Sequence, residues 1–128
     1  MHRTFVLLAA VFGFLGVGLG AFGSHALGAV WEARPDDRDT YQTGTQYHLI
    51  HAAALLGAAY VASAVSPTGR RWARAAGWLF AAGIVLFSGS LYLLSVLDLR
   101  FMGAVAPLGG AAFLAGWACL GIASRHLN

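Results

Sequence analysis

Histidine, serine and tyrosine side chains inside apolar segments are the residues of this chain best suited to chemistry. Imidazole binds metal ions and titrates near neutral pH, and hydroxyl groups both donate and accept hydrogen bonds. Inside a membrane such groups are costly and usually face the protein interior. The candidates are His25, His48, His51, Ser88, Ser90 and Tyr92, together with Pro107, after which Gly109 and Gly110 allow a loosened backbone.

Three kinds of site are compatible with these residues. His25, His48 and His51 supply enough imidazole for a metal or haem site, and any one of them could relay protons. Their spacing matches no tight metal signature, and neither Cys nor carboxylate accompanies them at the same depth. We therefore favour histidines that form interhelical hydrogen bonds and expect no resident cofactor. We also expect no enzyme, because no acid inside the membrane completes a catalytic set; action on a lipid or quinone is the weakest alternative.

Four apolar segments must position these side chains. The chain of 128 residues is 59% hydrophobic and 10% charged, whereas a soluble domain carries roughly 25% charged residues. A spanning helix needs about 20 apolar residues, and the chain offers four such segments: Thr4–Leu27, Thr40–Val65, Trp72–Leu97 and Gly103–Ser124. Short polar connections, with Gly28–Asp39 as the longest loop, predict a single all-α domain in which four transmembrane helices run up and down.

The placement of arginine predicts the orientation of this bundle. All eight basic residues are Arg, and five of them fall on the side of the termini, namely Arg3, Arg70, Arg71, Arg74 and Arg125. Positive charge concentrates on the cytoplasmic side of membrane proteins, so both termini are expected in the cytoplasm and the polar candidates in the outer half of the bundle. The arginines are too scattered for nucleic-acid binding, and the single Cys119 excludes an intrachain disulfide.

Small residues predict tight packing between the helices. In the first segment Gly13, Gly16, Gly20 and Gly23 follow each other at spacings of 3, 4 and 3 and so share one face. Such a face lets two helix backbones approach closely in lipid. We expect it to contact a neighbour within the bundle, with a dimer interface as the alternative. Pro107 either kinks the last helix or lies in its first turn, where no amide is needed.

Four sequence motifs resemble a family of small bacterial membrane proteins, catalogued as domain of unknown function 423, with a eukaryotic branch known as transmembrane protein 256. The motifs occur in the family's order over nearly the whole chain, and they are Gly20-Ala21-Phe22-Gly23-Ser24-His25-Ala26-Leu27, Tyr47-His48-Leu49-Ile50-His51-Ala52, Leu86-Phe87-Ser88-Gly89-Ser90-Leu91-Tyr92 and Ala106-Pro107-Leu108-Gly109-Gly110. The resemblance implies four helices in the bacterial inner membrane and carries no activity with it. By the family's pattern His48 is a variable position, which counts against a three-histidine metal site.

The sequence therefore predicts a small multi-pass inner-membrane protein that acts without catalysis as an accessory or assembly partner. Its expected partners are the lipid bilayer and either further copies of the chain or a larger membrane complex. The alternative is a module that binds or transports a small ligand, a metal ion or protons through the polar cluster of the outer half.

Overall fold

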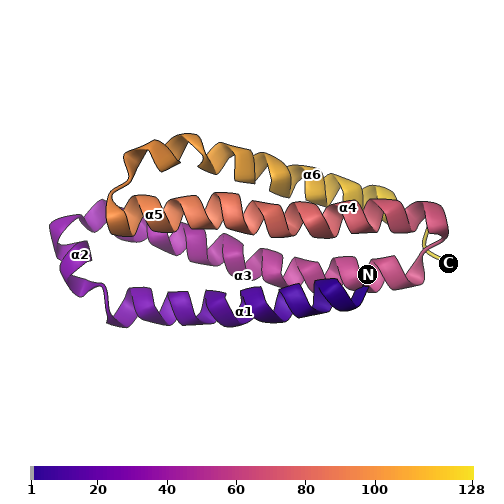
Figure 1. Ribbon diagram of the computed structural model, residues 1–128, viewed down its shortest axis with the longest axis horizontal. Helices are drawn as coiled ribbons and strands as arrows, with labels where there is room; N and C mark the ends of the chain where they lie inside the picture. Colours follow the sequence, from indigo (N-terminus) through magenta and orange to yellow (C-terminus); the bar gives the residue numbers. More distant parts are fainter. Residues whose placement is uncertain (1) are drawn as a thin grey trace.

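The computed structural model describes residues 2–128, and four long helices run through it in alternating directions (Figure 1). The first is α1 (His2–His25), and the short α2 (Gly28–Ala33) links it to α3 (Pro35–Ala64). The third span joins α4 (Pro67–Gly83), η1 (Ile84–Ser88) and α5 (Gly89–Leu97), and the fourth joins η2 (Arg100–Ala104) and α6 (Ala106–Ser124). All four are long and apolar enough to cross a membrane, which confirms the predicted four-span, all-α fold.

The segment expected as a loop between the first two spans is instead helical. It forms α2, and α3 begins at Pro35, five residues before the predicted start. Proline suits the first turn of a helix because no amide is needed there. The carboxylates of Asp36 and Asp37 stabilise the helix start because the N-terminus of a helix carries partial positive charge. The third span also starts earlier than predicted, at Pro67, with the hydroxyl of Ser66 accepting from the amide of Gly69.

The helices pack as a layered bundle around α3. Helix α1 lies along α3, α6 lies along α4, and α3 also contacts η1 and α5. The span containing α3 has the lowest mean hydropathy of the four, 1.2 against 2.4 for α1. A central helix tolerates polar residues because its neighbours, rather than lipid, surround them. The centre of the bundle is therefore where the polar candidates of α3 find partners.

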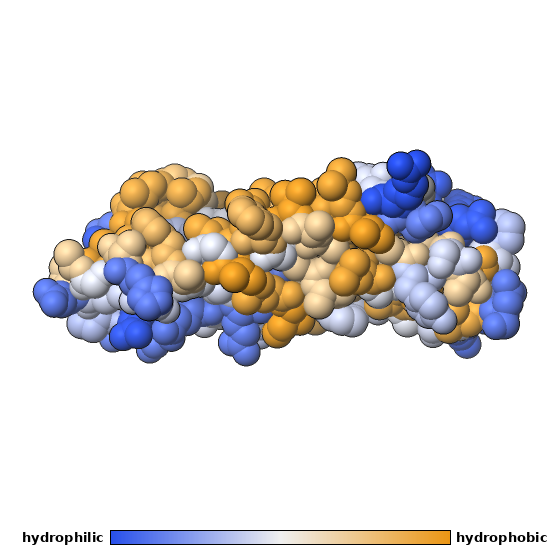
Figure 2. Space-filling model, turned by 90° about the horizontal axis from the view of Figure 1, so that it is seen from below, coloured by the Kyte–Doolittle hydropathy of each residue, from blue (hydrophilic) through white to orange (hydrophobic). Residues whose placement is uncertain are grey.

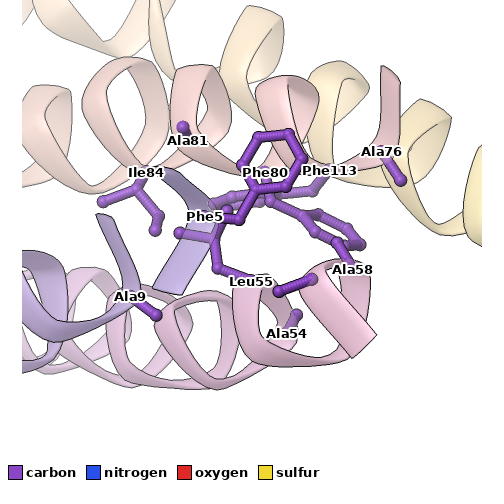
Figure 3. Close-up of a cluster of buried hydrophobic side chains, with 11 residues drawn as sticks. Phe5, Ala9, Ala54, Leu55, Ala58, Ala76, Phe80, Ala81, Ile84 and Phe113 are labelled. Carbon is purple, nitrogen blue, oxygen red and sulfur yellow. The ribbon is translucent and has the colours of Figure 1, made fainter. Parts of the chain in front are cut away.

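The apolar core lies where large rings meet small residues (Figure 3). Phe5, Phe80 and Leu55 are fully buried, with Ala58 and Ala76 beside them. A methyl group in place of the Gly77 hydrogen would lie 2.5 Å from the Phe5 ring, so glycine is needed there. Many large apolar side chains remain exposed, and Figure 2 shows them as a band between two hydrophilic ends. That band is what a bilayer-spanning protein presents to lipid.

Both termini and the turn between α3 and α4 lie at one end of the bundle (Figure 1). The amide of Ser66 donates to the carbonyl of His126 at 3.2 Å, and Val65 and Leu127 form an isolated antiparallel bridge. The opposite end, called the distal end below, consists of α2, the first turns of α3, the last turn of α5 and η2. His48 and His51 lie near the middle of α3, at the 14th and 17th of its 30 residues, so the expected position in the outer half fits His48 only narrowly and does not fit His51.

Candidate functional site

His51 lies in the bundle centre and has both ring nitrogens bonded. The indole Nε1 of Trp117 donates to His51 Nε2 at 2.9 Å, and His51 Nδ1 lies 2.7 Å from the carbonyl of Tyr47. Because indole can only donate, Nε2 accepts and the proton resides on Nδ1. The imidazole also stacks on Phe113 with ring centroids 3.6 Å apart. The ring is therefore held neutral, with its lone pair used in a link between α3 and α6.

His48 lies one turn earlier, and only one of its two ring nitrogens has a hydrogen-bond partner. Its Nδ1 is 2.8 Å from the hydroxyl of Tyr92, which joins α3 to α5. Its Nε2 is buried and has no hydrogen-bond partner among the described residues. The ring edge faces Phe12 of α1, with centroids 5.9 Å apart. Unpaired buried polar atoms are uncommon in native proteins. Among the buried side-chain nitrogen and oxygen atoms of residues 2–128, this nitrogen alone lacks a hydrogen-bond partner of normal geometry.

The serines of the third span satisfy backbone carbonyls. Ser88 donates to the carbonyl of Gly44 at 2.7 Å and so bonds η1 to α3. Ser90 donates to the carbonyl of Leu86 in its own helix. These hydroxyls lie in and just after a π-helical turn, in which the amide of Gly89 reaches back to the carbonyl of Ile84. Serine here acts as a hydrogen-bonding support for an irregular stretch of helix.

His25 and Pro107 do not join this cluster. His25 is exposed at the end of α1, and Pro107 is exposed in the first turn of α6. In that first turn a missing amide costs no hydrogen bond, so α6, which begins at Ala106, includes the proline without a kink. Residues 2–128 contain no group of three His, Cys, Asp or Glu placed to hold a metal ion. Of the predicted site residues, the structure brings only His48 and Tyr92 into direct contact. His51, Ser88 and Ser90 are buried with other partners, and His25 lies apart from all of them.

Three glycines of α1 face α3. An added Cβ would lie 2.7 Å from Leu49 at Gly16, 3.2 Å from Thr45 at Gly20 and 2.2 Å from the Tyr41 ring at Gly23. At Gly13 it would meet nothing within 4 Å. Three of the four glycines on the predicted face therefore make contact within the bundle, and Gly13 does not.

A charge cluster at the distal end was not anticipated from the sequence. Asp37 accepts from Arg34 Nε at 2.7 Å and from both terminal nitrogens of Arg100, at 2.6 and 3.1 Å. Arg34 also donates to the carbonyls of Ser95 and Val96 at 2.7 and 3.1 Å, where α5 ends. Asp37 precedes the apolar part of α3, and the hydrogen bonds from Arg100 and then Arg34 lower the pKa of its carboxyl against the opposing effect of burial.

Trp117 was also missed as a partner for His51. No local sequence pattern pairs a residue of the second span with one of the fourth. The pairing depends on how α6, which packs mainly on α4, is tilted and rotated relative to α3. The distal charges are likewise spread over two connections in the sequence. Their shared position arises because α2 and η2 fold over the same end of the bundle (Figure 1).

The fold and this arrangement define a small multi-pass α-helical membrane protein, whose central polar groups are bonded between helices. The model of the family described as "Protein of unknown function (DUF423)" matches residues 19–110, and the chain belongs to that family. This confirms the resemblance carried by the four motifs.

Two relatives illustrate the family's range. The chain is 44% identical over 124 residues to the UPF0382 membrane protein YwdK of Bacillus subtilis, covering 95% of this chain and 96% of that protein. It is 39% identical over 126 residues to the UPF0382 inner membrane protein YgdD of Escherichia coli K12, covering 98% and 92%. No solved structure matches the chain. With four spanning helices and such relatives, the predicted inner-membrane location is confirmed.

Proposed function

We propose that this chain is a non-catalytic helical bundle that serves as an accessory or assembly partner of other proteins in the inner membrane. One observation carries the proposal: the polar side chains of the spans are largely bonded to each other across helices. His51 binds Trp117, Tyr92 binds His48, and Ser88 binds the carbonyl of Gly44. Groups engaged in this way hold helices in register and are poorly available to a substrate.

The outward face of α6 supports the partner role. It exposes the small residues Ala111, Ala115, Ala118 and Gly121 beside the larger Leu114, which is 75% exposed, and an added Cβ at Gly121 would meet nothing within 4 Å. In lipid, helix association depends on close backbone approach, which small residues permit. Because α6 packs mainly on α4 within the chain, this face is open to a helix of another protein.

Crosslinking inside the native membrane tests this role. A photo-crosslinking amino acid at Ala115 is expected to give one discrete protein adduct, and an added Ala118→Phe substitution to abolish it. The control carries the same crosslinker at Ala82, which is exposed on α4 instead. If both positions give only lipid adducts and the chain is monomeric in native-membrane particles, the assembly role is refuted.

The unpaired nitrogen of His48 favours a second candidate, a module that binds a proton or small ligand in the bundle. Its Nε2 is buried and lacks a partner among residues 2–128, which leaves one site for an exchangeable proton or a bound water. Nitrogen NMR of imidazole-labelled protein tests it: the His48 signals are expected to move with pH or added metal while those of His51 stay constant. Constant signals at both rings exclude this second candidate.

We also propose that the end bearing the termini lies in the cytoplasm. Arg3, Arg70, Arg71, Arg74 and Arg125 are the five arginines of that end. The distal end has only three, and two of these, Arg34 and Arg100, are paired with Asp37. Since the positive-inside preference counts Lys and Arg near the span ends, the majority of five supports this orientation.

A further inference from the structure

A polar groove runs between α1 and α3 near the distal end, and neither the family nor the central cluster accounts for it. Its volume is about 280 Å³, and it opens to the surface. Its polar lining comes from Ser24, Arg38, Gln42, Thr45 and Gln46, while Leu49 lies at its inner limit. Polar side chains on a surface that faces lipid are energetically costly unless they form hydrogen bonds. A molecule with acceptor atoms would supply these hydrogen bonds to the donors of the groove.

The donors of the groove form a line along α3. Arg38, Gln42 and Gln46 are each four residues apart and therefore lie on one face. With a rise of 1.5 Å per residue, Gln42 lies about 6 Å and Gln46 about 12 Å below Arg38. All three side chains are exposed. None of the three donates or accepts a side-chain hydrogen bond within the described residues, whereas Thr45 already donates to the carbonyl of Tyr41 at 3.2 Å.

The level of these donors matches the layers of a phospholipid monolayer. The headgroup layer on each side of the hydrocarbon is roughly 5–8 Å thick, from a total of 40–45 Å and a core of 30 Å. Arg38 lies in the first turns of α3, at the charged distal end, and lines the groove together with Trp31. Gln42 then falls at the glycerol and ester layer. The backbone of Gln46 lies just below that layer, and because helix side chains tilt towards the helix N-terminus, its amide reaches back towards the esters. A phosphate above ester carbonyls presents acceptors in the same order.

The charges indicate which lipid fits. Arg38 makes no ion pair within residues 2–128, in contrast to Arg34 and Arg100, so its guanidinium is available for a phosphate. The distal end as a whole has five acids (Glu32, Asp36, Asp37, Asp39 and Asp98) and three arginines, a balance of 3 − 5 = −2. This balance disfavours a lipid with net negative charge and favours a zwitterionic one.

We propose that the α1–α3 groove binds one zwitterionic, ester-linked glycerophospholipid, with its phosphate on Arg38 and its ester carbonyls on the amides of Gln42 and Gln46. One acyl chain then runs past Leu49, over the side of α1 where Gly16 and Gly20 bring the two helices together. The site is distinct from the α6 face and does not depend on the assembly role.

Native mass spectrometry in detergent, with titrated dioleoyl phosphatidylethanolamine and its ether-linked analogue, tests the site. The ether lipid keeps the phosphate but lacks the carbonyl acceptors. For the unchanged chain, we expect the ester lipid to bind about tenfold more tightly, as two neutral hydrogen bonds imply. Gln42→Leu with Gln46→Leu is expected to erase that difference. Arg38→Gln is expected to weaken both lipids by about tenfold, because a charge-assisted bond is lost.

Thr43→Val is the matched control, since Thr43 is exposed on the same helix at the same depth but does not line the groove. It is expected to bind both lipids as the unchanged chain does. Equal binding of ester and ether lipids by the unchanged chain overturns the proposal, and this comparison needs no variant to fold. Equal lipid retention by Arg38→Gln and Thr43→Val overturns the phosphate contact. A dimer mass that disappears in the Gln42→Leu, Gln46→Leu double variant means that a second copy of the chain occupies the groove, and it overturns the lipid proposal.

Discussion

The closest backbone approach between α6 and its neighbours gives a sharp test of the packing. A Cβ added at Gly109 would lie 2.3 Å from the backbone nitrogen of Phe87 and 2.7 Å from its Cα. Ordinary contact begins at 3.4 Å, so the shortfall is 3.4 − 2.3, or about 1.1 Å. The obstacle is main chain inside a π-helical turn and no side-chain rotation relieves it. Gly109→Ala therefore has to push α6 away from η1.

Gly109→Ala is expected to lower the free energy of unfolding by about 3 kcal/mol, the upper end of the range for overpacked cores. This corresponds to a folding equilibrium constant about 150-fold smaller. Gly110→Ala is the matched control, because its Cβ would lie 3.9 Å from the Phe87 ring. It is expected to be neutral or to stabilise by up to about 1 kcal/mol through helix propensity. Reversible unfolding in mixed micelles with SDS, followed by far-UV circular dichroism, measures both. Equal stability of the two variants would refute the close approach of α6 to η1.

Three further predictions concern polar contacts and orientation. A double-mutant cycle of His51→Leu and Trp117→Phe, read out by the same unfolding assay, is expected to give a coupling of about 0.6 kcal/mol, as is usual for interhelical hydrogen bonds in membranes; zero coupling contradicts the bond. Hydrogen bonds from Arg100 lower the pKa of Asp37 below its ordinary 3.8. The contribution of Asp37 to the free energy of unfolding is therefore expected to be fully present above pH 3.8 and to be lost as the pH falls through the lower pKa of the folded state. Asp37→Asn is expected to remove this acid dependence, and an unchanged acid profile contradicts it. Alkaline phosphatase fused after the C-terminus is expected to be inactive and fused within residues 98–100 to be active; the reverse pattern refutes the proposed orientation.

The helical spans were predictable because membrane insertion depends on local composition. Each run of about 20 apolar residues must satisfy its own backbone hydrogen bonds, and only a helix does so within one segment. The ends of the helices were less predictable. Seven of the twelve residues in Gly28–Asp39 are charged or proline, which favours a loop. The second half nevertheless starts α3, because Pro35 and two aspartates suit a helix start and the Arg34 side chain bonds the end of α5. That last contact is tertiary and leaves no local signal.

The sequence by itself determined that this protein spans the membrane four times, that small residues bring its helices together, and that polar groups of α3 and of the third span lie at similar depth. These properties follow from residue type and from period along one helix. Only the tertiary structure decided that Trp117 donates to His51, that His48 keeps one nitrogen unpaired, and that Arg38 heads a polar groove beside α1. Such pairings depend on how each helix is rotated and tilted against its neighbours, and that rotation is determined by packing among all four spans together.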